Sequence, residues 1–338
     1  MIGLSIHWNQ LIMSTTKSIH FVARPKGNPE AANFELVESS LPEVNDGEVL
    51  IKNAYMSVDP YMRGVMRHAP LGATMIGGSV GQIIVSKNPD FAEGDYVSNS
   101  AGWCEHAISS GKELVKVDPD VAPLSSYLGV LGMPGLTAYG GLLVTGGLKD
   151  GETVFVSAAS GAVGSLVGQI AKIKGCTVIG SAGSDEKVRQ IKEQYGFDHA
   201  FNYKTANALD ELRAAAPDGI DVYFENVGGS QLEAALTHMR IDGRIPVCGM
   251  IAHYNDHGTA SPGPTNLTEI IYKRIMLKGF VVTEFGALKE EFLREMSGWI
   301  SSGEVKYQET VYEGIENAHK AFIDLFTGAN KGKMLVKL

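Results

Sequence analysis

The hydrophobic pattern divides the chain into two stretches of different character. Over roughly the first 125 residues, short runs rich in β-branched and aromatic residues alternate with turn signals such as Asn88-Pro89 and Glu93-Gly94-Asp95. Runs of this length, bounded by turns, are typical of strands. We therefore predict a β-rich N-terminal region, with strands at Val49–Asn53, Gly81–Ser86, Tyr96–Ser98 and Leu114–Val117.

From about residue 128 onward, buried strands alternate with amphipathic helices. The predicted strands are Thr153–Ala158, Thr177–Ser181, His199–Asn202, Asp221–Glu225 and Arg244–Cys248. The predicted helices are Ala162–Lys174, Asp185–Tyr195 (with Ser184 as N-cap), Ala206–Ala215, Ser230–Met239 and Leu288–Ser302. Short connections between such elements imply βαβ units, and so a doubly wound parallel sheet with right-handed crossovers.

The last 33 or so residues return to a strand-like pattern. Strands are predicted at Tyr307–Val311 and Met334–Val336, on either side of a helix at Ile315–Phe326. The fold class expected from these patterns is α/β, with a β-rich domain and a Rossmann doubly wound parallel sheet.

Composition narrows the class of protein without changing this picture. The formal net charge is −9 and no basic stripe is present, so nucleic acid is not expected as a partner. Cys104, Cys176 and Cys248 are widely spaced and odd in number, which argues against a disulfide framework or a structural zinc site and favours a cytoplasmic setting. The uncharged windows Val121–Leu148 and Thr153–Ala171 are interpreted as buried core, because neither is a continuous apolar span.

The first 13 residues, MIGLSIHWNQLIM, make a poor signal peptide, since they have neither a positive n-region nor an A-x-A cleavage site. Met13 precedes a polar stretch and is a second candidate for the start of the protein. Residues 1–12 are therefore either native or an upstream extension, and both interpretations stay open.

Glycine makes up 40 of 338 residues, about 12% against roughly 7% on average, and one cluster carries a chemical signal. The segment Val154–Gly164, VFVSAASGAVG, is a G-x-G-x-x-G variant with Ala159 at the first glycine position. It follows a strand and opens a helix, so we expect the turn Ser160, Gly161, Ala162, Val163 and Gly164 to hold the pyrophosphate of a dinucleotide. The alternative is a tight turn without a ligand.

The end of the second strand of this unit indicates which dinucleotide is bound. NAD enzymes usually carry Asp or Glu there for the ribose 2′-hydroxyl, whereas this chain has Gly180-Ser181-Ala182-Gly183-Ser184. Lys187 follows on the first helical turn, and Tyr203 ends the third strand. Small residues with a lysine leave room and positive charge for a 2′-phosphate, so NADPH is the expected cofactor. A solvated surface lysine is the alternative for Lys187.

At this point the chain resembles the medium-chain dehydrogenase/reductase superfamily. Within it, the chain is similar to the zinc-free NADPH-dependent alkene reductases, which include leukotriene/prostaglandin reductases and, most similar of all, bacterial curcumin reductases. The resemblance runs from about Ile19 to the C-terminus. The segments that carry it are Asp59–Gly64, Gly132–Tyr139, Ala158–Gly164, Gly183–Lys187, Phe201–Lys204, Glu225–Gly229, Cys248–Met250, Tyr254-Asn255 and Gly328–Lys333.

The resemblance implies a domain organisation and a set of cofactor contacts. A GroES-like catalytic domain would span residues 1–127 and a Rossmann NADPH-binding domain 128–304, with 305–338 completing the catalytic domain. Homodimerisation through strands near Met276–Val282 is a further expectation. The residues implied at the cofactor, besides the glycine-rich turn with Gly183 and Ser184, are Met133, Thr137, Lys187, Tyr203, Asn226, Cys248, Gly249, Met250 and Asn330.

The same resemblance argues against a catalytic metal. Zinc alcohol dehydrogenases have a cysteine in the region of Ser57 and a Gly-His-Glu near Gly77-Gly78-Ser79, and these ligands are missing from this chain. His253 and His257 lie on a predicted loop and are interpreted as surface residues. We expect no metal site.

The activity implied is NADPH-dependent reduction of the C=C bond of α,β-unsaturated ketones or aldehydes. Tyr254 is the candidate hydrogen-bond donor to the carbonyl oxygen, because an unperturbed tyrosine is protonated at neutral pH. Tyr55, Tyr61 and His68 are candidates for the substrate pocket, and Arg63 is predicted to be an ion-pair partner. The alternatives are a quinone or carbonyl reductase on the same scaffold, or a non-catalytic NADPH-binding protein.

Overall fold

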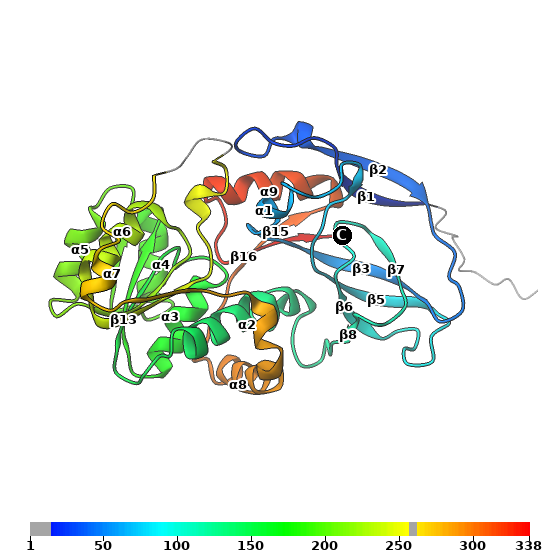
Figure 1. The fold of residues 1–338 in the computed structure, drawn as a ribbon. Coiled ribbons are helices and arrows are strands. Elements are labelled where there is room, and N and C mark those ends of the chain that lie inside the picture. The colour runs from blue at the N-terminus through cyan, green and yellow to red at the C-terminus, as the bar shows by residue number, and fades with distance from the viewer. Residues whose placement is uncertain (1–14, 257–261) are drawn as a thin grey trace, which may run out of the picture.

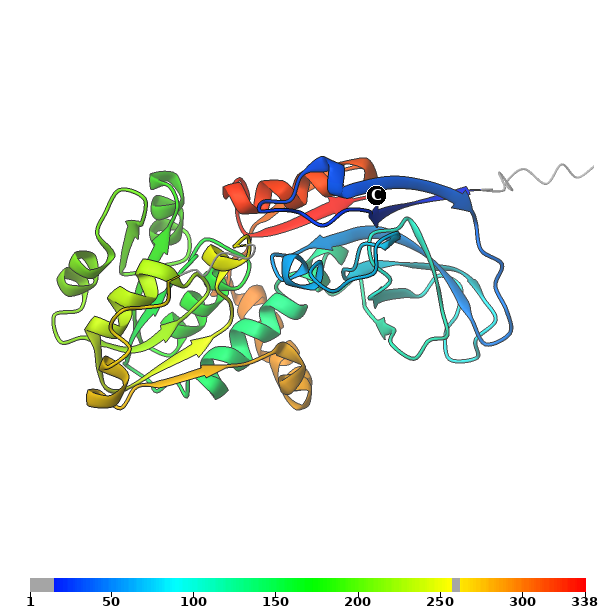
Figure 2. The same cartoon turned by 45° about the horizontal axis from the view of Figure 1, so that its top comes forward.

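The computed structural model describes residues 15–256 and 262–338, which form two halves that together contain three sheets (Figure 1). Residues 1–12, with their two open interpretations, and His257 lie outside the described residues. The C-terminus lies with the β-rich part, beside the strands from the beginning of the chain (Figures 1 and 2).

The nucleotide-binding half expected from the alternating pattern contains a sheet of six parallel strands. Their order is β11-β10-β9-β12-β13-β14, so the predicted doubly wound parallel sheet is confirmed. The strands are β9 (Thr153–Val156), β10 (Thr177–Ala182), β11 (His199–Asn202), β12 (Ile220–Phe224), β13 (Met239–Val247) and β14 (Met276–Gly279).

Alternate residues of the central strands face two different cores, as expected for strands covered on both sides. Val154 and Val156 pack in one cluster with apolar residues of α2, α3 and α8, while Phe155 packs in the other with α5 and α6. The helices are α2 (Met133–Gly140), α3 (Gly164–Ile173), α4 (Asp185–Glu193), α5 (Ala208–Ala215), α6 (Gly229–His238), α7 (Glu269–Tyr272) and α8 (Lys289–Ser302). Ser184 caps α4 as predicted, because its side chain accepts a hydrogen bond from the Lys187 backbone N–H.

The β-rich half contains a seven-stranded sheet ordered β15-β16-β3-β5-β6-β8, with β7 also paired to β3. The late strands β15 and β16 extend the sheet of the early strand β3, beneath helix α9 (Figure 2). The elements are β3 (Val49–Val58), α1 (Met62–Val65), β5 (Ser79–Ser86), β6 (Tyr96–Asn99), β7 (His106–Ser109), β8 (Val115–Lys116), β15 (Glu309–Glu313), α9 (Ala318–Thr327) and β16 (Lys333–Lys337).

A separate three-stranded sheet, ordered β2-β1-β4, was not predicted from the sequence. Its strands are β1 (Thr15–Phe21), β2 (Phe34–Ser40) and β4 (Ala73–Thr74). Most residues of β2 are exposed, so this strand lacks the alternation of apolar and polar residues by which a half-buried strand is recognised.

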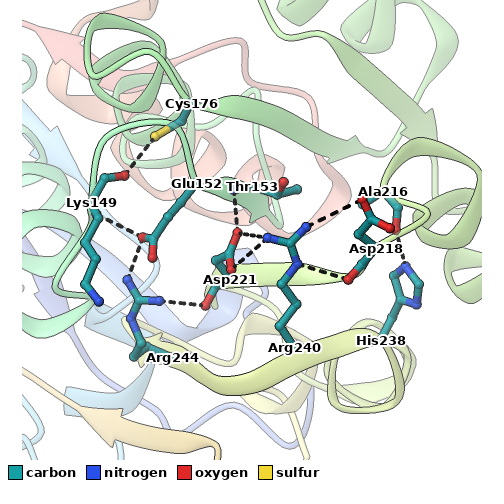
Figure 3. A network of polar contacts seen from close by, with 10 residues as sticks. All are labelled: Lys149, Glu152, Thr153, Cys176, Ala216, Asp218, Asp221, His238, Arg240 and Arg244. Atoms are coloured by element: carbon teal, nitrogen blue, oxygen red, sulfur yellow. Dashed lines mark hydrogen bonds and ion pairs between the residues drawn. The ribbon is translucent and has the colours of Figure 1, made fainter.

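Two arginines of β13 tie together the N-terminal ends of the central strands, away from the strand ends where a ligand is expected (Figure 3). Arg244 pairs with Glu152 at 2.6 Å and donates to the Asp221 carbonyl oxygen. Arg240 pairs with the Asp221 carboxylate at 3.1 Å. Asp221 in turn accepts from the Thr153 backbone N–H, so the network joins β9, β12 and β13.

Candidate functional site

A cavity of about 530 Å³ lies at the C-terminal ends of β9, β12 and β13, where the Rossmann rule places a ligand. Helix α2 and the segment before α1 complete its wall. The predicted site residues that line it are Tyr61, Met133, Thr137, Gly161, Ala162, Val163, Gly164, Asn226, Cys248, Gly249 and Tyr254. The lining residues to which the sequence assigned no role are Asp59, Pro60, Pro134, Ala158 and Ile251. Phe280, Val281 and Val282 also line it, although they were expected only near a dimer interface.

The glycine-rich turn between β9 and α3 has the geometry of a pyrophosphate cradle. A Cβ atom at Gly164 would lie 2.5 Å from the Ala158 carbonyl oxygen, so only glycine lets α3 begin this close to the strand. The first turn of a helix leaves backbone N–H groups without intrahelical partners and carries a partial positive charge. Because Ala162 and Val163 lie at this helix start and line the cavity, the turn fits an anionic ligand group.

The segment before β16 runs along the same turn. The Gly332 backbone N–H donates to the Ser160 carbonyl oxygen at 3.0 Å, and Gly161 and Gly332 form an isolated parallel β-bridge. The Asn330 amide donates to the Gly332 carbonyl oxygen at 2.8 Å. Asn330 is therefore next to the cradle, as the family resemblance implies, although 166 residues separate it from Gly164.

A cluster of lysines lies beyond the cradle, around the end of β10. The pKa of Lys187 is lowered by burial and also by the charges of Lys204 and Lys331. A Cβ atom at Gly183 would lie 3.1 Å from the Tyr203 hydroxyl, so this glycine leaves the space between strand end and tyrosine open. Mutual repulsion of the lysines would be relieved by a bound phosphate, which makes the cluster suitable for a 2′-phosphate.

Two features of this cluster differ from the sequence-based prediction. Lys204 and Lys331 received no role, and the spacing of basic residues in the sequence does not indicate that they meet Lys187. Gly180 was expected to clear space for the phosphate, but a Cβ atom there would lie 2.7 Å from the Phe197 ring. Gly180 is therefore required for packing inside the sheet.

The turn after β12 is organised by a buried carboxylate. Glu225 is fully buried, and its Oε1 accepts hydrogen bonds from Ser157, from Tyr223 and from the backbone N–H groups of Val227 and Gly228. Burial raises the pKa of this carboxyl group. The turn holds Asn226, whose side-chain amide donates to the Ser157 carbonyl oxygen at 2.8 Å.

Tyr254 reaches the cavity from the loop after β13. A Cβ atom at Gly249 would lie 2.7 Å from the Tyr254 hydroxyl oxygen, so glycine is needed for the ring to lie over this strand end. Burial raises the Tyr254 pKa, while a hydrogen bond from the Met250 backbone opposes that shift. Within residues 15–256 and 262–338 no acceptor is found for the hydroxyl proton, so that proton is available for a ligand. Met250 itself is not among the lining residues and packs against the core shared with α5 and α6.

A buried ion pair supports the opposite wall. Asp59 is 3.0 Å from Lys333, and both side chains are almost inaccessible to solvent. The Lys333 ammonium also donates to the carbonyl oxygens of Val58 and Met334, so the pair fixes β16 against the end of β3. Beside it, burial and the Asp59 charge raise the pKa of Tyr61 to about 12.

Comparison with known proteins agrees with this geometry. The family described as N-terminal domain of oxidoreductase matches residues 17–117, and the family described as zinc-binding dehydrogenase matches residues 162–301. Prostaglandin reductase 1 of Bos taurus is 50% identical over 329 residues, covering 96% of this chain and 98% of the relative. The chain belongs to the medium-chain dehydrogenase/reductase family.

Bacterial members of this family are also similar. The NADPH-dependent curcumin reductase of Escherichia coli (strain K12) is 42% identical over 328 residues, covering 94% of this chain and 95% of the relative. The crystal structure of CurA in complex with NADPH, from Vibrio vulnificus, superposes with a TM-score of 0.89 at 41% identity, covering 95% and 98% of the two chains. The identity to the bovine prostaglandin reductase exceeds that to the curcumin reductase, so the expected order of similarity is corrected.

Three predicted residues of this medium-chain dehydrogenase/reductase lie away from the cavity. Tyr55 packs beside Val80 and Leu335 and is not among the described residues that line the cavity. His68 is exposed beyond the end of α1. Arg63 was predicted to be an ion-pair partner, but among residues 15–256 and 262–338 it forms no ion pair and bonds to backbone and amide oxygens instead.

The positions that carry zinc ligands in related alcohol dehydrogenases do come together in this structure. Ser57, Gly77 and Gly78 line a second cavity of about 590 Å³, and the Ser57 backbone N–H donates to the Gly78 carbonyl oxygen at 2.8 Å. This cavity shares Asp59, Tyr61, Met133 and Val282 with the first. Within the described ranges, no cluster of three or more His, Cys, Asp and Glu side chains suited to a metal ion is found.

A membrane-spanning helix must be both long and apolar. None of the helices within 15–256 and 262–338 is long and apolar enough to cross a bilayer.

Proposed function

We propose that this protein reduces the C=C bond of α,β-unsaturated ketones or aldehydes with NADPH. The observation that carries the proposal is the Tyr254 hydroxyl, which lies over Gly249 in the cavity and has no acceptor for its proton among the described residues. The names of the relatives, prostaglandin reductase and NADPH-dependent curcumin reductase, support the same class of reaction.

NADPH fits the residues of the site from end to end. The turn Gly161–Gly164 would hold the pyrophosphate, with Ser160 and Asn330 beside it, and Lys187, Tyr203 and Gly183 would surround the 2′-phosphate. Met133 and Thr137 would flank the nicotinamide ring, together with Asn226 and the turn Cys248-Gly249. The bound cofactor supplies a hydride.

In the proposed reaction the hydride forms a new C–H bond at the β-carbon of the enone. The electron pair of the C=C bond shifts toward the carbonyl, so that negative charge accumulates on the carbonyl oxygen as an enolate. The Tyr254 hydroxyl stabilises that charge by donating a hydrogen bond, and water then protonates the α-carbon. Because its pKa is raised above the usual 10, Tyr254 stays a donor throughout the neutral and mildly alkaline range.

The test compares Tyr254→Phe with Tyr61→Phe, since both rings line the same cavity. Loss of an oxyanion donor costs about 10²–10³-fold in kcat, so Tyr254→Phe should fall by that order on 4-phenyl-3-buten-2-one while still binding NADPH. Full activity of Tyr254→Phe, or the larger loss in Tyr61→Phe, would contradict the assignment. Allylic alcohol or hydroquinone products would favour a carbonyl or quinone reductase, and NADPH binding without any turnover would favour a non-catalytic protein.

We also propose that the protein is a homodimer and that it is located in the cytoplasm. Strand β14 is the outer strand of its sheet and is exposed along its length, with Met276 and Leu277 accessible, which supports homodimerisation through this edge. Three free cysteines and a nicotinamide cofactor are compatible with the cytoplasm.

The domain limits proposed are 1–127 for the catalytic domain, 128–304 for the NADPH-binding domain and 305–338 for the segment that completes the first. They are supported by the pairing of β16 with β3 and by the six-stranded sheet lying wholly between residues 128 and 304.

A further inference from the structure

Three segments far apart in the chain are joined by a short chain of hydrogen bonds next to Tyr254. The Arg63 Nε atom of α1 donates to the Asn255 Oδ1 atom at 2.9 Å. The Asn255 amide then donates to the Asn28 side-chain oxygen at 2.6 Å. Arg63 also donates through Nη2 to the Gly27 carbonyl oxygen at 2.9 Å. We call Arg63, Asn255, Asn28 and the Gly27 carbonyl the latch.

The latch connects the two walls of the cavity. Arg63 is two residues from Tyr61, and Asn255 directly follows Tyr254, and both tyrosines line the cavity. Asn28 and Arg63 belong to the β-rich half, whereas Asn255 lies on the loop after β13 of the parallel sheet. The latch therefore fixes the loop that carries Tyr254 relative to the opposite half of the molecule.

Arg63 is a buried charge without a carboxylate partner among the described residues. Its side chain is completely buried, its Nη1 atom has no hydrogen-bond partner among the described residues, and no described carboxylate pairs with it. Burying a guanidinium without a counterion is costly, and an apolar residue of similar volume would stabilise the fold at least as well. The Arg63 guanidinium instead donates hydrogen bonds to Asn255 and to the Gly27 carbonyl oxygen.

We propose that the latch positions Tyr254 for the reaction, with Asn255 as its positioning residue. This inference rests on the proposed function, because it requires Tyr254 to be the donor. Without its latch bonds, Asn255 loses its link to the β-rich half, and, among the described residues, the backbone bonds of Ile251 and Ala252 to the turn after β12 still hold the loop. The Tyr254 hydroxyl is then less well aligned with the enone oxygen. A displacement of about 1 Å at a reacting group can cost up to 10²-fold in rate.

The test is a double-mutant cycle with Asn255→Ala and Tyr254→Phe, using NADPH and 4-phenyl-3-buten-2-one as probes. Asn255→Ala should lower kcat by about tenfold or more, with the Kd for NADPH changed by less than about twofold. In the Tyr254→Phe background the same substitution should have no further effect, because the latch acts through the missing hydroxyl. Asn255→Asp keeps an acceptor for Arg63 but loses the amide that donates to Asn28, so it should retain more activity than Asn255→Ala and less than the unchanged protein. Asn317→Ala, which removes an exposed amide bonded to the Glu313 backbone, is the matched control and should leave kcat unchanged.

The outcomes separate the two claims. Full kcat in Asn255→Ala, or an equal loss from that substitution in both backgrounds, would contradict the latch alone. Full kcat in Tyr254→Phe would contradict the proposed function and the latch with it. If Asn255→Ala does not fold, Asn28→Ala, which removes the acceptor of the Asn255 amide, takes its place in the cycle: full kcat, or an equal loss in both backgrounds, would again overturn the latch.

Discussion

At the scale of single residues, we expect the lysine cluster around Gly183 to select NADPH over NADH. Lys187 already bonds the Gly328 carbonyl oxygen at 2.8 Å, so its ammonium is held in place before a phosphate arrives. Each charge-assisted hydrogen bond contributes about 1.5–3 kcal/mol, which corresponds to roughly 10–100-fold in affinity.

Lys187→Ala should therefore raise the KM for NADPH at least about tenfold while changing the KM for NADH by less than about threefold. Lys172→Ala, whose partner Asp198 lies away from the cavity, is the control. Initial-rate kinetics with both coenzymes check this. Equal losses with NADPH and NADH would show that Lys187 does not contact the 2′-phosphate.

Cys248 lines the cavity, but it should be a poor nucleophile. Burial and the nearby Glu225 raise its pKa to about 12, so at pH 8 only about one thiol in ten thousand is ionised. Iodoacetamide labelling of the native protein should be slow at pH 8 and accelerate as the pH rises toward that pKa. Mass spectrometry of the labelled peptides measures this, and labelling at pH 8 as fast as that of a free thiol would contradict it.

Residue types and spacing predicted much of the site, because the cradle is local in sequence. Gly161, Gly164 and the following helix are contiguous, so the shape of this turn follows from consecutive residues. Asp59 and Tyr55 illustrate the limit: both are on or near β3, and strand register decides that the first lines the cavity while the second packs in the core.

At the scale of elements, the parallel strands were predictable because both of their faces are buried. Strand β12 is apolar at nearly every position, and its prediction differs by one residue at each end. Strand β2 was missed, and β14 was expected only from the family resemblance. Both are exposed edge strands, which have no strict hydrophobic period. The pairing of β16 with β3 joins residues almost 280 apart, which local patterns do not encode.

The network in Figure 3 gives a stability prediction at this scale. Arg244 and Glu152 are each about 15% exposed, so their 2.6 Å pair is well shielded from solvent. Arg244→Ala should lower the free energy of unfolding by about 2 kcal/mol, because it removes the Arg244 donor from a largely buried carboxylate and from three carbonyl oxygens. Denaturant unfolding followed by circular dichroism measures this.

Arg274 provides the matched comparison for that prediction. It pairs with Asp242 through two hydrogen bonds, one more than Arg244 makes to Glu152, but both side chains are more than 60% exposed. Arg274→Ala should leave the unfolding midpoint nearly unchanged, since solvent and salt screen such pairs. A loss as large as that of Arg244→Ala would show that burial does not determine the strength of these pairs.

At the scale of the whole molecule, the exposed edge at β14 predicts the assembly. If two copies pair along this edge, Gly279→Pro removes a backbone donor from β14 and should shift the protein from dimer to monomer in light-scattering chromatography. Leu338, in the β-rich half (Figure 1), offers a control position, Leu338→Ala, that should remain dimeric. A Gly279→Pro variant that stays dimeric would place the interface elsewhere.

The cavity itself belongs to this scale, because its walls come from both halves of the molecule. The sequence shows Asp59, Met133 and Tyr254 only in separate motifs. The fold brings all three to the same cavity. The central claim is that, in this cavity, a hydride from NADPH is transferred to the β-carbon of an enone.

The most direct measurement is the fate of deuterium from NADPH labelled at the transferred position of its nicotinamide ring. With 4-phenyl-3-buten-2-one, we expect the saturated ketone with one deuterium at the β-carbon, identified by mass spectrometry and NMR. An allylic alcohol with deuterium at the carbinol carbon, or no deuterium transfer despite bound NADPH, would contradict the account.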